Sequence, residues 1–365
     1  MKDFYAIIMV KHEEAMKSRL PAAFHKILGR RVIDYMLLNL AEMKPRGIFV
    51  LLEEQYLEHM EKTPVEVICK TVESTTVEDI KAKYGGDVEY VILDKMLPHV
   101  LSYDVLKIMS DEENEDYEPL DRLHLYEYAR LISTTINVGH TRNGVSIIKY
   151  ENTRIGPDVK IGMDTIIYPG VIIEGNTTIG ENCIIGQNCR LVDMKIGDNV
   201  EIWDSTCLES EIGDGTSVGP YAYLRPGSVV GKDCKIGNFV EVKNAIVGDG
   251  SKASHLSYIG DAHIGKDVNF GCGAITVNYD GKKKHRTIVE DDAFIGCNTN
   301  LIAPVTVGKG AYTAAGSTIT DDVPPGDLGI ARARQVNKEN WVARRGDFPG
   351  RPLEETNNVS NFRTG

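Results

Sequence analysis

The 365-residue chain lacks any long hydrophobic run, because none of its apolar stretches approaches the roughly 18 residues of a membrane span. Its first residues also lack the charged, apolar and small-residue pattern of a signal peptide. The net charge of −12 argues against binding to a nucleic-acid backbone, which requires clustered cations. These absences predict a cytoplasmic protein that binds neither membranes nor nucleic acids.

The seven cysteines include no CxxC pair and no Cys/His cluster at zinc spacing. Their pattern excludes both a disulfide framework and a structural zinc site. Aromatic residues make up only 7% of the chain, whereas glycine, with 35 residues, exceeds its ordinary share of about 7%. An excess of glycine at regular places indicates a repeat.

The repeat begins at residue 155 and advances in steps of six residues. Each unit opens with an aliphatic residue, often followed by glycine, and has a small or β-branched residue in fifth place. The first six units open at Ile155, Ile161, Ile167, Ile173, Ile179 and Ile185. Period six matches neither a helix nor the alternation of a single strand. It predicts a mainly β fold, a solenoid of short parallel strands in which three strands make one triangular coil.

Three cysteines, Cys183, Cys189 and Cys234, occupy the small fifth position of their units. We therefore expect them to be buried as small hydrophobic side chains rather than to serve redox or metal chemistry. Two segments break the rhythm, a loop at 277–288 and the end of the repeat at 321–326. Because insertions in solenoids gather on binding faces, the first loop is a candidate site.

The region before the repeat reads as a small α/β domain followed by a helix. Strands are expected at 4–10, 48–52, 65–72 and 88–93, and helices at 31–40 and 121–137. Gly139 is expected just past the end of the second helix. Six acidic residues gather in 111–118, which predicts a solvated linker. The predicted domains are 1–118 (α/β), 119–150 (arm helix and connector), 151–330 (β-helix) and 331–365 (irregular tail).

Four segments of the repeat carry a family resemblance: RPGSVVGKDCKIGNFVEVKNA (225–245), GSKASHLSYIGDAHIG (250–265), VNFGCGAITVNYDGKKKHRT (268–287) and LIAPVTVGKGAYTAAGSTIT (301–320). They resemble the acetyltransferase half of the bifunctional enzyme of bacterial UDP-N-acetylglucosamine synthesis. In that enzyme a glucosamine-1-phosphate N-acetyltransferase is fused to an N-acetylglucosamine-1-phosphate uridyltransferase. The resemblance covers about residues 121–345. It implies a left-handed β-helix assembled as a homotrimer, with acetyl-CoA bound between subunits.

The resemblance also implies roles for individual residues. His255 matches the catalytic base, and N-acetylation needs one, because a proton must leave nitrogen as the C–N bond forms. A neutral imidazole accepts that proton near pH 7; a merely solvated or packed histidine is the alternative. The residues matched to binding of the sugar phosphate are Arg225, Lys243, Tyr258, Asn269 and Lys284. No metal is expected to be needed for acetyl transfer.

The coenzyme contacts implied by the resemblance lie beyond His255 in the chain. They fall on Cys272, Asn278, Tyr279, Cys297, Ala315 and Arg332. Two of these depart from the family, which has alanine where this chain has Cys272 and serine where it has Cys297. Replacing a hydroxyl by a thiol weakens a hydrogen bond, so Cys297 is expected to alter this coenzyme contact.

The N-terminal part resembles the start of the uridyltransferase half but lacks several residues that the resemblance associates with its chemistry. Met16, Leu20, Pro21, His25 and Gly29 keep the scaffold. The loop glycines that wrap the nucleotide are replaced by Lys11 and Glu13, and a further acid, Glu14, follows. The phosphate-neutralising Arg and Lys are replaced by Ala15 and Ala22, and the metal-binding Asn by Leu120. Acidic side chains repel a triphosphate, so uridylyl transfer is predicted to be lost.

These observations predict a monofunctional acetyltransferase that converts glucosamine 1-phosphate and acetyl-CoA into N-acetylglucosamine 1-phosphate and CoA. Two alternatives stay open. One is the same chemistry on another amino sugar or sugar nucleotide. The other is a non-catalytic scaffold that pairs with a separate uridyltransferase.

Overall fold

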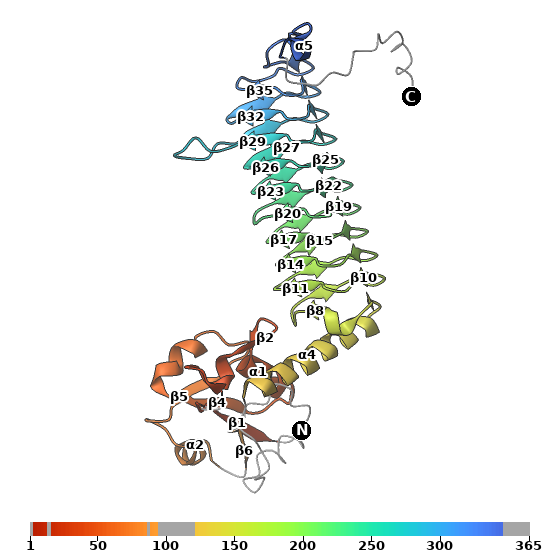
Figure 1. The fold of residues 1–365 in the computed structure, drawn as a ribbon. Coiled ribbons are helices and arrows are strands. Elements are labelled where there is room, and N and C mark those ends of the chain that lie inside the picture. The colour runs from red at the N-terminus through yellow and green to blue at the C-terminus, as the bar shows by residue number, and fades with distance from the viewer. Residues whose placement is uncertain (1–2, 13–15, 86–87, 94–120, 346–365) are drawn as a thin grey trace.

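The computed structural model describes residues 3–12, 16–85, 88–93 and 121–345. A small α/β region lies at one end and a long β-helix rises from it, with the helix α4 between them (Figure 1). Within these ranges, no helix combines the length and apolar character needed to cross a membrane. The acidic stretch 111–118, the residues Glu13, Glu14, Ala15 and Leu120, and the tail from 346 onward lie outside the described residues.

The β-helix consists of three parallel sheets that share one apolar interior. The eleven-stranded sheet contains β7 (Ser146–Ile147), β10 (Ile166–Ile167), β13 (Ile184–Ile185), β16 (Glu201–Ile202), β19 (Ser217–Val218), β22 (Lys235–Asn238), β25 (Lys252–His255), β28 (Asn269–Phe270), β31 (Phe294–Ile295), β34 (Tyr312–Thr313) and β36 (Leu328–Gly329). The ten-stranded sheet contains β8 (Arg154–Ile155), β11 (Ile172–Glu174), β14 (Arg190–Val192), β17 (Thr206–Leu208), β20 (Tyr223–Leu224), β23 (Glu241–Lys243), β26 (Tyr258–Gly260), β29 (Ile275–Val277), β32 (Asn300–Ile302) and β35 (Thr318–Ile319). The nine-stranded sheet contains β9 (Lys160–Ile161), β12 (Thr178–Ile179), β15 (Lys195–Ile196), β18 (Glu211–Ile212), β21 (Val229–Val230), β24 (Ile246–Val247), β27 (Ala262–Ile264), β30 (Thr287–Val289) and β33 (Val305–Val307).

Successive strands visit the three sheets in turn, so each coil stacks on the previous one in register. Ile173, for example, pairs with Ile155 on one side and Leu191 on the other, and all three are fully buried. The predicted opening residues of the first six units are buried, except Ile161, which is half-buried. The predicted fold, a left-handed parallel β-helix of six-residue units, is confirmed.

Glycine and asparagine occupy different positions at the corners of a coil. A Cβ on Gly162 would lie 2.6 Å from the backbone of Gly180 in the next coil, so coil stacking excludes a side chain there. The left-handed conformation falls instead on the fourth residue of the unit, as at Asn182 and Asn188, each with φ of 56°. Asparagine tolerates this conformation better than most residues.

The expected burial of the fifth-position cysteines is confirmed. Cys183, Cys189 and Cys234 are at most 2% exposed. Burial raises the pKa of all three thiols, that of Cys189 to about 11. Such thiols are poor nucleophiles, because the thiolate is the reactive form.

The α/β region contains a parallel four-stranded sheet in the order β5–β4–β1–β6. Its elements are β1 (Phe4–Met9), η2 (Ala22–Phe24), β2 (Lys26–Ile27), β3 (Arg30–Arg31), α1 (Val32–Glu42), β4 (Gly47–Leu52), η3 (Glu54–Met60), β5 (Ile68–Thr71), α2 (Val77–Tyr84) and β6 (Glu89–Leu93). The four expected strands and the expected helix are therefore present. The hairpin β2–β3 adds an antiparallel pair that the sequence did not signal.

The arm helix α4 (Arg122–Arg142) begins as predicted but ends later. Asp121 caps its first turn by accepting a hydrogen bond from the backbone of His124. The expectation that Gly139 lies beyond its end is wrong, because the helix continues to Arg142. Ile136 packs against the cores of both the α/β region and the β-helix, and this double contact holds the last turns in place. The remaining short elements are η4 (Tyr150–Asn152) and α5 (Trp341–Arg345).

Candidate active site

Two columns of corner residues border the ten-stranded sheet. The chain enters this sheet at one corner, which contains His255, and leaves it at another, which contains Lys243. We call these the His255 corner and the Lys243 corner. Because the coils stack in register, residues that are far apart in sequence line up along each corner.

His255 ends β25 and is exposed at its corner. Its Nδ1 lies 2.6 Å from Oδ1 of Asn238, which occupies the paired position one coil before it. An amide oxygen can only accept a hydrogen bond, so Nδ1 carries the proton and donates it. With Nδ1 donating, Nε2 is the ring nitrogen whose lone pair can accept a proton, as a general base requires.

The His255 corner continues through residues matched to the coenzyme. Cys272 lies one coil beyond His255, and Cys297 and Ala315 follow in the next two coils. Backbone hydrogen bonds join these corners: Asn298 donates to Cys272 and Gly316 donates to Cys297, both at 2.8 Å. At the far end, the side chain of Arg332 lies beside Gly316. The corner thus forms a continuous line of positions that starts at the histidine.

The Lys243 corner gathers cations around one carboxylate. Lys243 and Lys284 lie 3.8 Å and 4.0 Å from Oδ2 of Asp261, a residue that is only 8% exposed. The neighbouring Lys243 ammonium lowers the pKa of Lys284 from its usual value. Two ammonium groups with a single shared carboxylate leave excess positive charge here, which suits a phosphate.

Arg225 and Tyr258 border this cation cluster. Arg225 donates a hydrogen bond of 2.9 Å to Glu241, and this bond raises the pKa of the guanidinium. Tyr258 lies in register with Glu241, and its hydroxyl is 3.4 Å from the amide nitrogen of Asn278. The predicted substrate residues Arg225, Lys243, Tyr258 and Lys284 therefore lie together in one chain.

The expelled loop is anchored at its base and folded at its tip. Asn278 is buried and donates a 2.5 Å hydrogen bond to Oδ2 of Asp261. At the tip, Asp280 accepts hydrogen bonds from the backbone of Lys283 and Lys282 and contacts His285. The backbone bond from Lys283 and the contact with His285 lower the pKa of Asp280 to about 2. Tyr279 is exposed on this loop, which projects from the side of the β-helix near β29 (Figure 1).

Asn269 stands apart from the other predicted substrate residues. It begins β28 in the eleven-stranded sheet, in register with Lys252 and Phe294. Within one chain it therefore lies on a different face from the Lys243 corner.

Sequence reasoning missed four residues that organise the site: Asn238, Glu241, Asp261 and Asp280. They stand inside the segments that carry the family resemblance, but the resemblance implied roles only for other positions. Three of them contact a predicted site residue, and Asp280 folds the tip of the loop. Asn238 and Asp261 each lie 17 residues from the group they contact, His255 and Asn278 respectively. That spacing is one full coil, and it is the signal that could have found them.

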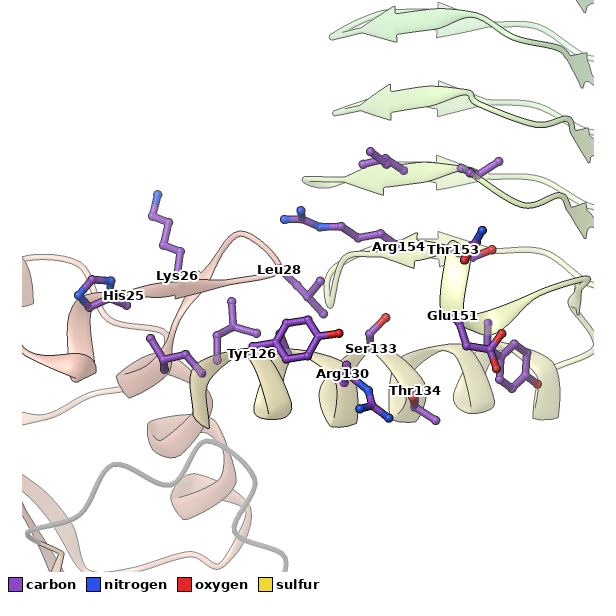
Figure 2. Close-up of a pocket in the computed structure, with 18 of the residues that line it drawn as sticks. His25, Lys26, Leu28, Tyr126, Arg130, Ser133, Thr134, Glu151, Thr153 and Arg154 are labelled. Atoms are coloured by element: carbon purple, nitrogen blue, oxygen red, sulfur yellow. The ribbon is translucent and has the colours of Figure 1, made fainter. Parts of the chain in front are cut away.

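A large cleft lies far from these residues, between the β2–β3 hairpin, α4 and the first coils of the β-helix. Its volume is about 1000 Å³. Figure 2 shows Tyr126 and Ser133 rising from α4 on the side of the first coil, and Arg154 extending toward the hairpin. Arg154 already pairs with Glu174 at 3.0 Å. None of the predicted site residues lines this cleft, so its size does not mark it as the active site.

Among the described residues, no three His, Cys, Asp or Glu side chains are grouped so that they could hold a metal ion. The acids near the site are instead engaged by cations and amides, as at Asp261 and Glu241.

The bacterial transferase hexapeptide family model matches residues 152–192, 209–244 and 286–321. These ranges lie within the stacked coils of the three-sheet interior. The chain carries bacterial transferase hexapeptide repeats. The unmatched segment 245–285 contains His255 and most of the expelled loop. Part of the candidate site therefore lies between two matched ranges of the repeat.

Relatives extend the likeness beyond the repeat. The bifunctional protein GlmU of Acetivibrio thermocellus is 57% identical over 226 residues, which is 62% of this chain and 49% of that protein. GlmU of a Geobacillus species is 59% identical over 224 residues, and GlmU of Caldicellulosiruptor saccharolyticus is 51% identical over 260 residues. The resemblance to this bifunctional family is thereby confirmed. The chain spans about half the length of these relatives.

Among solved structures, the hexapeptide chain is similar to the UDP-N-acetylglucosamine acyltransferase of Campylobacter jejuni. The identity is 22%, the TM-score is 0.32, and the match covers 56% of this chain and 78% of that one.

Proposed function

We propose that the β-helix transfers acetyl from acetyl-CoA to the amine of glucosamine 1-phosphate, giving N-acetylglucosamine 1-phosphate and CoA. One observation carries the proposal. The hydrogen bond between Nδ1 and Asn238 leaves Nε2 of His255 to act as the base at the start of the coenzyme-matched corner, and the cations of the Lys243 corner lie across the same sheet. The match to GlmU proteins supports this assignment over other hexapeptide transferases.

The reaction needs one proton acceptor and one leaving group. The unprotonated amine attacks the thioester carbonyl, and Nε2 of His255 accepts the proton that nitrogen releases. The C–S bond then breaks, and the departing CoA thiolate takes up the proton that Nε2 holds, so His255 is regenerated as the base. Asn238 keeps Nδ1 protonated throughout, so Nε2 is always the atom that accepts. Asn238 therefore acts as a positioning residue.

The cations supply substrate recognition. Lys243 and Lys284 would bind the phosphate of the amino sugar by charge-assisted hydrogen bonds, with Arg225 beside them. Asp261 holds both ammonium groups near the same point, and Tyr258 and Asn278 border that point. Asn269 lies on another face and would reach a substrate only from a second chain.

The coenzyme would run along the His255 corner. Neighbouring coils lie about 4.8 Å apart, so the corner from Cys272 through Cys297 to Ala315 offers a narrow, extended track. Asn278 and Tyr279 belong to the other corner and would contact the coenzyme across a subunit boundary.

Thiol release from acetyl-CoA with glucosamine 1-phosphate as acceptor tests the proposal. We expect turnover with this acceptor and little with glucosamine or UDP-linked amino sugars. Preference for another amine in the panel would favour the alternative acceptor. No thiol release with any amine would favour the scaffold alternative. Acetyl transfer that EDTA abolishes and Mg²⁺ restores would contradict a metal-free reaction.

The α/β region is proposed to be catalytically silent and structural. Ala22, which stands where the family has a phosphate-neutralising lysine, is fully buried and presents only a methyl group. Arg30 forms a 2.5 Å salt bridge to Asp158 of the first coils, and Ile132 of α4 packs into the core of this region. Pyrophosphate release from UTP and N-acetylglucosamine 1-phosphate would contradict this role.

A homotrimer is proposed because apolar residues are exposed along the His255 corner. Tyr221, Phe239 and Leu256 are 59%, 55% and 57% exposed in successive coils, and the first two rings stack at 5.5 Å. A contiguous apolar strip of this kind marks an interface. Cyclic packing of three prisms would cover it and create three equivalent clefts. The projecting loop around Tyr279 would then reach a neighbouring subunit.

Subunit mixing tests the assembly. His255→Ala and Asn278→Ala subunits, each of low activity alone, are dissociated and combined. If the two residues serve one site from different chains, mixed trimers recover part of the activity. Full activity from a monomer, measured by light scattering at the assay concentration, would contradict the homotrimer.

A further inference from the structure

Two cysteines of the β-helix differ from the rest in exposure. Cys297 is exposed and Cys272 is half-buried. The other cysteines of the β-helix are buried, and Cys69 of the α/β region is half-buried with its thiol pKa raised by burial. Accessible thiols are the ones that react with oxidants, so within the β-helix thiol chemistry concentrates on this pair.

Cys272 and Cys297 are neighbours in space although the expelled loop separates them in sequence. On one side of their corner Phe270 pairs with Ile295, and on the other side Ile275 pairs with Asn300. Both pairings have the same 25-residue offset, so no residue is inserted at the corner between them. Cys272 therefore stacks directly on Cys297, as the 2.8 Å hydrogen bond from Asn298 to the Cys272 carbonyl shows.

The spacing of the coils suits a bond between the two thiols. Neighbouring strands lie about 4.8 Å apart. Disulfide-bonded cysteines have Cα atoms about 4.4–6.8 Å apart, so the backbone positions are within range. Their Cβ atoms must approach to about 3.5–4.5 Å, slightly closer than stacked coils hold them. A bond formed here is therefore strained and readily reduced.

We infer that Cys272 and Cys297 form a reversible disulfide that responds to small disulfide oxidants. The Cys297 thiolate attacks the oxidant, forms a mixed disulfide and expels one thiolate. The Cys272 thiolate then attacks the Cys297 sulfur and expels the second. The two protein thiols lose two protons and two electrons, and the oxidant is reduced to two thiols.

The consequence for activity rests on the proposed function. Cys272 lies one coil from His255, and Ala315 lies one coil beyond Cys297. A bond between the cysteines lies across the proposed coenzyme track, so oxidation abolishes acetyl transfer and bound acetyl-CoA slows oxidation. Dithiothreitol restores both thiols and the activity.

Oxidised glutathione is the probe, applied to the full-length protein before free thiols are blocked and the protein is digested. We expect one linked peptide pair, Cys272 with Cys297, that disappears after dithiothreitol. In Cys272→Ala, Cys297 retains the glutathione adduct, because no second thiol displaces it. The control Cys69→Ala leaves the linkage and the basal activity unchanged.

The outcomes separate the two proposals. Adducts on Cys297 of the wild-type protein without a linked peptide would overturn the disulfide. A linked peptide in a protein that transfers no acetyl group in either redox state would uphold the disulfide and overturn the proposed function. A linked peptide with unchanged acetyl transfer would overturn the regulatory role.

Discussion

The β-helix and the α/β region both rest on parallel strands, yet they place functional side chains in different ways. In the β-helix, a residue at a corner is aligned with its equivalents one coil away, as Asn238 is with His255. In the α/β region, the positions expected to bind a nucleotide lie between β1 and α1, and Ala22 falls in the short η2.

This difference bears on the prediction that the β-helix keeps its chemistry while the α/β region has lost its own. Corner positions of the β-helix are fixed by the same register that builds the core, so its geometry persists while the fold persists. Ala22 in η2 lies outside the four-stranded sheet, so its side chain can change without altering the register of the strands. The four-stranded sheet indeed remains, with Phe49 and Leu51 buried, while Ala22 has no charge to offer.

Removing the base is expected to have the largest effect. His255→Ala should lower turnover by roughly 10²–10⁴-fold, because the amine then loses the proposed acceptor of its proton. The measurement is thiol release at saturating substrates, with circular dichroism to verify the fold. Full activity of the variant at neutral pH would contradict the assignment.

The second largest effect is expected from a substitution that creates a cavity in the core of the β-helix. Leu191→Ala should lower the free energy of unfolding by about 2–5 kcal/mol, since Leu191 is fully buried between Ile173 and Cys207. Leu37→Ala in α1 is the matched control and should destabilise the α/β region instead. Thermal melts followed by residual acetyl transfer distinguish the two regions. If both variants lost acetyl transfer at the same temperature, the two regions would not differ in their effect on the active site.

Lys284 tests whether the cations of the Lys243 corner bind the phosphate of the substrate. Lys284→Ala should raise the KM for glucosamine 1-phosphate by about 10–100-fold, as expected for a hydrogen bond to a charged group worth roughly 1.5–3 kcal/mol.

The lowered pKa of Lys284 adds a pH dependence. As pH rises, Lys284 loses its proton earlier than an ordinary lysine, so phosphate binding weakens at correspondingly milder alkaline pH. Lys284→Arg keeps the charge and should flatten this rise in KM. A wild-type KM that stays constant across the alkaline range would contradict the assigned role.

The positioning residue should have a smaller effect. Asn238→Ala removes a neutral hydrogen bond worth about 0.5–1.5 kcal/mol, so kcat should fall by roughly 2–10-fold. Asn238→Asp retains an acceptor for Nδ1 and should recover part of the loss. A merely structural role would change the melting temperature without this recovery by aspartate.

The smallest effect is expected in the α/β region. Ala22→Lys restores the charge of the family at one position, yet uridylyl transfer should remain absent, because Lys11 still replaces a loop glycine. Acetyl transfer should be unchanged. Pyrophosphate release is the measurement, and its appearance in this variant would show that the loop had kept its binding geometry.

Local patterns accounted for most of the architecture. The period of six predicted the β-helix, its inward residues and the burial of Cys183, because each unit repeats the same steric demands. The pattern also located the expelled loop. The end of α4 was misjudged at Gly139, since the double contact of Ile136 outweighs the low helix propensity of glycine.

The sequence by itself determined the repeat, and it predicted the candidate base and the replacement of the residues that bind the nucleotide. Only the tertiary structure decided which residues meet: Asn238 with His255, Asp261 with both lysines, and Cys272 with Cys297. The physical reason is register. A contact between coils depends on the number of residues in each full turn. An expelled loop adds residues to one turn without moving its corners, as the 25-residue step between the two cysteines shows.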